Sequence, residues 1–182
     1  MEKYDIAIIG SGVAGTFAAL RAAETHKAKV ILFELGHKPA KRRRQIEGFL
    51  GCFPTGDGKI YTNSIDQVLE QVDTKRANAA NKFVFKQLEE VTNLKVIKDK
   101  MPNVSVQKRI ESANFNISLN DYIQWKPESI HQLSKNIVEK IEGSKVLTQS
   151  FDNEVSKITK QKNGFIISNQ EGDIFLAKIS PS

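Results

Sequence analysis

Three glycines between an apolar run and a helix-forming run constrain this chain more than any other feature. Residues 6–23 read IAIIGSGVAGTFAALRAA, and the glycines satisfy the spacing G-x-G-x-x-G. In that pattern the first glycine, Gly10, makes a tight turn, and the second, Gly12, lets the backbone approach a pyrophosphate. The third, Gly15, lets a helix pack closely against a strand. The order of strand, turn and helix predicts the beginning of a βαβ unit.

The residues on both sides of this turn predict a dinucleotide ligand. A helix beginning at Val13 would direct its unpaired N–H groups and positive dipole end at phosphates. The next apolar run, Lys29–Glu34 (KVILFE), predicts a second buried strand that ends in a carboxylate. Glu34 would accept hydrogen bonds from ribose hydroxyls and would repel a 2′-phosphate, which disfavours NADP. The alternative is a structural glycine turn with a solvated Glu34, and the turn alone does not separate FAD from NAD.

The remaining chain predicts further strands and helices around an inserted segment. Residues 64–126 are expected to form an inserted subdomain with helices over 64–72 and 78–91. Val104, Val106 and Phe115 alternate with polar residues, which suggests short antiparallel strands within 95–125. The other predicted elements are strands over 4–9 and 145–150, helices over 13–25 and 127–142, a long loop over 36–63, and a three-stranded meander over 154–179.

Positive charge is concentrated in one loop. The net charge is +6, and residues 36–60 contribute 6 − 2 = +4 of it. Such a cluster suits a nucleic acid, a membrane surface or a phosphorylated cofactor. Its place beside a glycine turn favours a small phosphate ligand, and the lack of interleaved aromatic residues disfavours RNA. The loop's charged residues are Lys38, Lys41, Arg42, Arg43, Arg44 and Lys59 against Glu47 and Asp57.

The composition narrows the class of protein further. The single cysteine, Cys52, excludes an intramolecular disulfide, makes an ordinary metal site unlikely and is expected to serve packing. No apolar run reaches the roughly 18–20 residues that span a bilayer. The first strand begins so early that a signal peptide has no room. We therefore expect a cytoplasmic protein with no membrane partner, and we assign no chemistry to the three histidines or to Trp125.

The fingerprint resembles the opening of a known flavoprotein family. The run YDIAIIGSGVAGTFAALRAA…VILFELG is similar to the FAD-binding start of glutathione-reductase-type flavoproteins. The later helix, strand and meander resemble them too. The loop KRRRQIEGFLGCFPTGDGKIYT resembles the glycine-rich loop of uncharacterised FAD-dependent dehydrogenases. The resemblance covers residues 1–63 and 127–179, and the middle resembles nothing that we can name.

This resemblance implies roles for residues at matching positions. The pyrophosphate would lie against the turn, with Arg43 and Arg44 as cationic partners, and Glu34 would hold the adenosine ribose. Val155 would offer its backbone to the adenine. Gly58 and Lys59 would approach the isoalloxazine, where Lys59 could stabilise negative charge on the reduced flavin. Two alternatives without a binding role remain: the basic run is a solvated surface segment, and Asp57-Gly58 forms only a turn. The complete candidate set is Gly10, Ser11, Gly12, Val13, Ala14, Gly15, Glu34, Leu35, Arg43, Arg44, Gly58, Lys59 and Val155.

The resemblance also implies that parts of the flavoprotein fold are missing. In the family, the chain continues into a strand with an Ala-Thr-Gly-like turn and returns with a Gly-Asp element that holds the ribityl chain. Without these strands, Ile6–Ile9 would have an open apolar edge, which is a site for aggregation or for strand pairing with a partner. A second polypeptide could complete the fold, and we expect little turnover from these 182 residues alone.

The sequence therefore predicts an α/β, Rossmann-like FAD-binding fold with three layers, a parallel sheet and an antiparallel meander. The expected domains are 1–63 and 127–182 for FAD binding, with 64–126 as an inserted α+β subdomain. The predicted function is that of an FAD-dependent oxidoreductase or its FAD-binding amino-terminal part, with a nicotinamide nucleotide as a candidate electron donor. The alternative is a non-catalytic dinucleotide-binding module or one subunit of a split flavoenzyme. The substrate is an unknown small molecule, no catalytic residue or metal is assigned, and nucleic acid is disfavoured.

Overall fold

The computed structural model shows two compact units. One unit comprises Met1–Gly56 with Pro127–Ser182, and the other comprises Asp57–Lys126. The structure describes residues 2–41, 48–51, 58–61, 72–92, 96–117, 119–170, 172 and 174–178. The side chains of 127–130 and 174–178 are outside this description.

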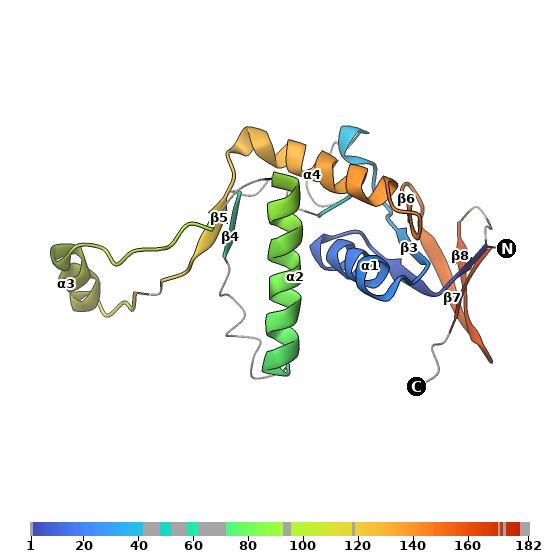
Figure 1. The fold of residues 1–182 in the computed structure, drawn as a ribbon, viewed down its shortest axis with the longest axis horizontal. Coiled ribbons are helices and arrows are strands. Elements are labelled where there is room, and N and C mark those ends of the chain that lie inside the picture. The colour runs from blue at the N-terminus through green and yellow to red at the C-terminus, as the bar shows by residue number, and fades with distance from the viewer. Residues whose placement is uncertain are drawn as a thin grey trace. The chain divides into compact units, whose positions relative to one another are not determined.

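A three-stranded parallel sheet forms the centre of the first unit (Figure 1). Its strands are β2 (Ile6–Ile9), β3 (Val30–Phe33) and β6 (Leu147–Ser150), in the order β2-β3-β6. All four side chains of β3 are at most 1% exposed, because this strand is covered on both faces. This arrangement confirms the predicted parallel sheet and explains why VILF is apolar at every position.

Two crossover helices cover one face of this sheet. Helix α1 (Val13–His26) connects β2 to β3, and α4 (Pro127–Glu142) precedes β6. Successive strands are added in one direction, so right-handed crossovers place both helices on the same side. The helices are joined by an ion pair between Lys140 and Glu24, with 3.1 Å between Nζ and Oε1. The buried side chains at helical spacing are Phe17, Leu20 and Ala23 on α1, and Leu133, Ile137 and Ile141 on α4.

The predicted meander is present and covers the opposite face. Strands β7 (Val155–Gln161), β8 (Gly164–Asn169) and β9 (Ile174–Lys178) are antiparallel neighbours in a second sheet of order β1-β9-β8-β7. Ile31 and Phe33 of the parallel sheet form one buried cluster with Tyr4 and Ile167. Helices, parallel sheet and meander therefore form the three predicted layers.

The predicted single strand over 4–9 is wrong, because it is divided at Asp5. Its first part, β1 (Glu2–Tyr4), pairs in parallel with β9 in the meander sheet, and its second part is β2. The backbone amides of Asp5 and Ile6 both donate to the carbonyl of Lys29, at 2.8 and 3.2 Å. In return, the amide of Lys29 donates to the Asp5 carboxylate at 2.9 Å. This reciprocal contact holds the bend by which the chain passes from one sheet to the other.

Within the described residues, β2 has a neighbouring strand on one side only. Ile9 at its end is 52% exposed, whereas its partner in the register, Phe33, is 1% exposed. The expected apolar edge at Ile6–Ile9 is therefore present in the part of the chain that the structure describes.

The second unit combines a two-stranded sheet with two helices. Strands β4 (Lys59–Tyr61) and β5 (Tyr122–Gln124) pair antiparallel, and Ile97 forms an additional bridge with Tyr122. Helix α2 (Thr74–Thr92) contains the helix predicted over 78–91 and begins four residues earlier. The helix predicted over 64–72 lies outside the described residues except at its last position.

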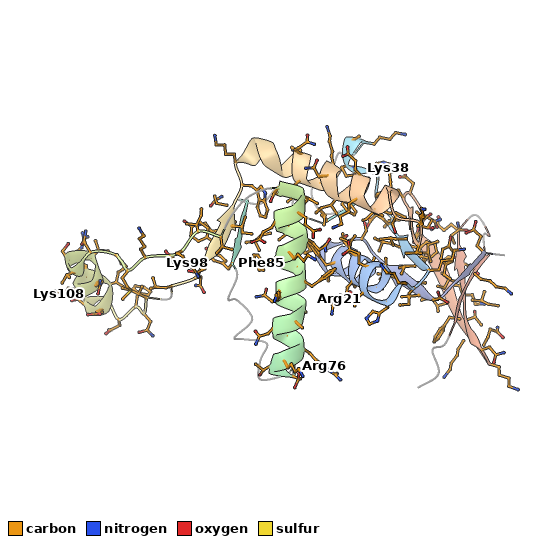
Figure 2. All side chains as sticks on the ribbon, viewed as in Figure 1. Arg21, Lys38, Arg76, Phe85, Lys98 and Lys108 are labelled. Atoms are coloured by element: carbon orange, nitrogen blue, oxygen red, sulfur yellow. The ribbon has the colours of Figure 1, made fainter. Side chains whose placement is uncertain are left out.

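The alternating pattern within 95–125 is misleading, because residues Val104–Ser112 form helix α3. The side chain of Asn103 accepts a hydrogen bond from the amide of Val106 at 3.0 Å and so caps the first turn. Val104 and Val106 do not face a core, since they are 65% and 36% exposed. Figure 2 labels Lys98 and Lys108, which lie on either side of this cap in the chain. The alternation at Val104 and Val106 therefore does not mark a strand, whereas antiparallel pairing is found elsewhere within 95–125, at β5 and at the bridge of Ile97 with Tyr122.

Part of the predicted long loop has local structure. A single 3-10 turn, η1 (Pro39–Lys41), and strand β4 both lie within the range 36–63. Cys52 and the Asp57 end of the glycine-rich loop lie outside the described residues.

Among the helices of the described chain, none is long and apolar enough to cross a bilayer.

Replacing Gly15 by alanine should destabilise the fold, since the added Cβ would lie 2.0 Å from the carbonyl oxygen of Gly10. We expect the free energy of unfolding to fall by about 2–3 kcal/mol, as for overpacking at a rigid backbone contact. The matched control is Gly12→Ala, whose Cβ would meet no atom within 4 Å. Urea unfolding followed by circular dichroism measures both, and equal stability of the two variants would contradict the proposed close packing.

Candidate functional site

The glycine turn lies between the end of β2 and the start of α1. Gly10 has φ = +92°, a conformation that side chains disfavour, and its amide donates to the carbonyl of Phe33 at 2.9 Å. Gly12 is the N-cap of α1, and Gly15 packs its α-carbon against the carbonyl of Gly10. The turn therefore needs glycine for different reasons at 10 and at 15, which agrees with the roles predicted from the spacing.

Among the described residues, the space in front of this turn is open. A Cβ built on Gly10 or Gly12 would meet no atom within 4 Å. The first turn of α1 has no side-chain cap and no acidic residue. Its amides and positive dipole end can therefore approach an anion, a contribution worth about 0.3–1 kcal/mol for an exposed charge and up to about 2 kcal/mol when partly buried.

Glu34 connects the turn to the end of β3. One carboxylate oxygen, Oε2, accepts hydrogen bonds from the amide and the hydroxyl of Ser11, at 2.8 and 2.7 Å. The other oxygen, Oε1, accepts from the amide of Gly36 at 2.8 Å. The residue is only 7% exposed, so three donors compensate the burial of its charge. Ser11 is fully buried and fixed by this contact.

The loops after β3 and β6 are hydrogen-bonded to each other beside Glu34. The amide of Glu34 donates to Ser150 at 2.8 Å, and the amide of Asn153 donates back to the carbonyl of Glu34 at 3.0 Å. The amide of Asp152 donates to the carbonyl of Gly36 at 3.2 Å, and the side chains of His37 and Asp152 are hydrogen-bonded to each other. The carboxyl ends of two parallel strands therefore carry one connected polar layer, where ligands of open α/β sheets bind.

Two amide side chains in this region are absent from the set predicted from the sequence. Asn153 donates through Nδ2 to the hydroxyl of Ser150 at 2.8 Å, but its buried Oδ1 has no hydrogen-bond partner among the described residues. Both polar atoms of the Gln149 amide are likewise buried and without a partner in the described chain. Buried polar atoms of this kind require an explanation, and a ligand or water that hydrogen-bonds to them provides one. Gln149 lies within the strand predicted over 145–150, and Asn153 lies three residues after that strand. This position at the carboxyl end of a predicted parallel strand is the sequence feature that could have identified them.

Apolar side chains form a rim around the turn. Ile9, Val13 and Leu35 are 52%, 44% and 57% exposed, and they lie at the end of β2, the start of α1 and the end of β3. Large apolar side chains at the edge of a polar site can cover the sugar and base of a nucleotide. Val13 and Leu35 belonged to the predicted set, and Ile9 did not.

The predicted cationic partners Arg43 and Arg44 lie outside the described residues. Residues just before and just after that segment are described. Lys38, labelled in Figure 2, forms an ion pair with Glu142 at 2.8 Å and lies over the ring of Phe151 at 5.6 Å. After the segment, the amide of Leu50 donates to the carbonyl of Ser11 at 2.7 Å. The basic loop thus returns to the glycine turn.

The remaining predicted residues are divided between the two units. Val155 is the first residue of β7 and packs against the cluster of Tyr4, Ile31 and Phe33 in the first unit. Gly58 and Lys59 belong to the second unit, at the beginning of β4. The structure brings together the turn residues 10–15 with Glu34 and Leu35. Among the described residues, no group of three His, Cys, Asp or Glu side chains could hold a metal ion.

These features fit the adenosine diphosphate portion of a dinucleotide. The open glycines and the helix terminus suit a pyrophosphate. Oε1 of Glu34 accepts one hydrogen bond in the structure, and a carboxylate oxygen can accept a second, from a ribose hydroxyl. The exposed apolar side chains of Ile9, Val13 and Leu35 suit the sugar and base. The residues that are present therefore fit the group that the sequence predicts.

Comparison with known proteins agrees with this arrangement. The family model of the FAD binding domain matches residues 5–40, the region that carries the glycine turn and Glu34. A vinyl phenol reductase of Lactiplantibacillus plantarum is 31% identical over 94 residues, which are 50% of this chain and 19% of that protein. The chain thus matches about a fifth of the length of this relative.

Solved structures share the fold at low sequence identity. PqsL of Pseudomonas aeruginosa, a probable FAD-dependent monooxygenase, has a TM-score of 0.53 at 15% identity, covering 97% of this chain and 41% of PqsL. Glycine oxidase of Geobacillus kaustophilus has a TM-score of 0.52 at 15% identity, covering 97% of this chain and 54% of the oxidase. The shared fold is the Rossmann-like FAD-binding fold. The narrower resemblance to the glutathione-reductase type stays a prediction.

Removing the Glu34 carboxylate should destabilise the first unit. We expect Glu34→Ala to lower the free energy of unfolding by about 2–3 kcal/mol, because it leaves the buried donors of Ser11 unpaired. The exposed carboxylate of Glu89 in α2 is the matched control, and Glu89→Ala should change stability by less than about 0.5 kcal/mol. A double-mutant cycle with Ser11→Ala, measured by urea unfolding, should give a coupling of at least about 0.5 kcal/mol. Additive effects would show that the two side chains do not interact.

Proposed function

We propose that this chain binds FAD by its adenosine diphosphate portion and acts as the FAD-binding part of a flavin-dependent oxidoreductase. The observation that carries the proposal is the open glycine turn at the start of α1, held by the Ser11–Glu34 contact, within residues 5–40 that match the FAD binding domain. The match supports FAD over NAD as the ligand. The whole enzyme's activity goes beyond this chain, which spans 41–54% of the structures named above.

In this proposal, each residue of the site has a binding task. Amides of Gly12, Val13 and Ala14 at the start of α1 hold the pyrophosphate, and Gly10 allows the close turn. Glu34 orients the adenosine ribose, and its contact with Ser11 fixes the distance between ribose site and phosphate site. Val155, the first residue of β7, is proposed to offer its backbone to the adenine. Arg43 and Arg44 are proposed to neutralise the phosphates.

The oxidation and reduction chemistry belongs to the flavin, which accepts and releases a hydride or single electrons when bound. The residues of this chain contribute binding and orientation. Gly58 and Lys59 remain proposed neighbours of the isoalloxazine, and Lys59 is the cation there that would favour negative charge on the reduced ring. A nicotinamide nucleotide is the proposed electron donor, and a second polypeptide that pairs with the edge of β2 is a proposed partner.

The substrate is proposed to be a small organic molecule. The relative that is 31% identical is named for its action on a vinyl phenol, and this name supports an aromatic substrate for the present chain. The relative shares half of this chain, so the reaction itself stays open.

Flavin retention tests the proposal directly. The purified chain, mixed with FAD and desalted, should retain close to one flavin per chain, as judged by absorbance. Gly12→Val should lose at least about 90% of it, because the side chain fills the space in front of α1 while touching no protein atom within 4 Å of its Cβ. Glu34→Ala should also lose flavin, whereas Glu89→Ala should retain it.

The outcomes separate the two functions that the sequence left open. Reduction of the bound flavin by NADH or NADPH under anaerobic conditions would support the oxidoreductase with that electron donor. Stable flavin that neither nucleotide reduces would favour a non-catalytic dinucleotide-binding module or a subunit of a split enzyme. A colourless chain that still binds ADP would contradict FAD as the ligand of this chain.

A further inference from the structure

A short segment that contacts the glycine turn is bent by three left-handed backbone conformations. Gly48, Leu50 and Gly51 have φ values of +106°, +63° and +56°, and the amide of Gly51 donates to the carbonyl of Gly48 at 3.0 Å. Glycine adopts such values readily, whereas leucine rarely does, because its Cβ approaches the backbone too closely. We call residues 48–51 the clamp segment.

Burial explains why Leu50 keeps this unfavourable conformation. Phe49 and Leu50 are 0% and 1% exposed, and the ring of Phe49 packs edge-to-face against that of Phe151, with 6.1 Å between the centroids. The burial of two large apolar side chains offsets the cost of one left-handed residue. A strained conformation persists only where its surroundings determine it, so the backbone at Leu50 depends on the packing of its side chain.

The clamp segment holds the glycine turn through one carbonyl group. The amide of Leu50 donates to the carbonyl oxygen of Ser11 at 2.7 Å, and the hydroxyl of Thr16 donates to the same oxygen at 2.9 Å. Ser11 and Thr16 are both fully buried. The two donors occupy both acceptor positions of this oxygen, so the direction of the Ser11 carbonyl is fixed.

The direction of this carbonyl determines where the amide of Gly12 points. Both groups belong to one planar trans peptide unit, in which the C=O and the N–H point in opposite directions. Because the Ser11 oxygen is held by Leu50 and Thr16, the Gly12 N–H is directed away from them. The clamp segment therefore sets the direction of an amide that the proposed function assigns to the pyrophosphate.

We propose that Leu50 is a positioning residue of the phosphate site, which acts through its backbone amide and the Ser11–Gly12 peptide unit. The identity of the anion rests on the proposed function, whereas the hold of Leu50 on Ser11 does not. When this hold is lost, the peptide unit rotates and fewer molecules present the Gly12 amide to an anion. The apparent affinity falls in proportion to the fraction of molecules that keep the binding geometry.

Replacing Leu50 by alanine and by glycine separates this role from simple packing. Both changes remove the buried side chain, but alanine disfavours a positive φ and glycine does not. Leu50→Ala should therefore let residue 50 return to a negative φ and release Ser11, whereas Leu50→Gly should keep the hydrogen bond. In isothermal titration with ADP, we expect the Kd to rise about tenfold in Leu50→Ala and less than about threefold in Leu50→Gly.

Thr16 offers an independent test at the same oxygen. Thr16→Val removes the hydroxyl at nearly constant volume, so we expect the Kd for ADP to rise about threefold, while Thr16→Ser should keep it within about twofold. Leu50→Ala and Thr16→Val act on one carbonyl, so their effects on log Kd should be non-additive. This pair of Thr16 variants also carries the test if Leu50→Ala does not fold.

The matched control is Leu133 in α4, which is likewise 1% exposed and lies in the core of the same unit. Leu133→Ala should lower the midpoint of urea unfolding by about 1–2 M, as should Leu50→Ala, and leave the ADP affinity of the folded chain unchanged. Leu133→Gly should be less stable than Leu133→Ala, because a helix interior disfavours glycine. At Leu50 the order of alanine and glycine should be reversed.

Hydrogen exchange followed by NMR without ligand distinguishes failure of this inference from failure of the proposed function. The amide of residue 50 should be protected in the wild type and in Leu50→Gly, and it should exchange rapidly in Leu50→Ala. Protection in all three proteins, equal ADP affinity of the two Leu50 variants, or an equal loss of affinity in Leu133→Ala would overturn the inference. A wild type with the expected protection that binds no ADP would support the hold on Ser11 and contradict the proposed function.

Discussion

The carboxylate of Glu34 is the contact on which the glycine turn and the ends of the adjacent strands depend. It accepts both donors of Ser11, which lies within the glycine turn, and the amide of Gly36, which lies beyond β3. A single buried charge thus joins the ends of two adjacent strands. Because two of its three donors are backbone amides, their directions are fixed by the fold, and together the three donors compensate the buried charge. The open space in front of α1 is kept in shape by this contact.

The two units separate different kinds of recognition. The first unit offers fixed backbone amides, one carboxylate and a rim of apolar side chains, which suit a ligand of constant structure such as a nucleotide. The second unit offers side chains on a short sheet, which can change in sequence without altering a turn or a crossover.

Sequence reasoning predicted the first unit better than the second. The glycine spacing, the apolar run of β3 and the proline and glycine limits of α4 each determine local structure over a short range, and these elements were found. The bend at Asp5 depends on Lys29 across the sheet, so the run 4–9 contained no local sign of it. The contact of Ser11 with Glu34 was equally hidden, although both residues were in the candidate set.

The errors in the second unit have a common physical cause. Val104 and Val106 alternate with polar residues, as in a strand, yet neither is buried, and the side chain of Asn103 caps a helix instead. Alternation is informative only when one face of the segment packs on a core. The small sheet of the second unit depends on strand pairing between residues 59–61 and 122–124, which are about 60 positions apart, and no local pattern specifies that register.

The passage of the first strand between two sheets has a consequence for synthesis of the chain. Strand β1 pairs with β9, and β3 pairs with β6, so strands near the start wait for partners from the second half. At about 5–20 residues per second, β9 emerges on the order of ten seconds or more after β1. During that interval the apolar strand β2 and its neighbour β3 have no complete sheet to join. Completion of both sheets therefore requires contacts between distant parts of the chain, which form more slowly than local ones.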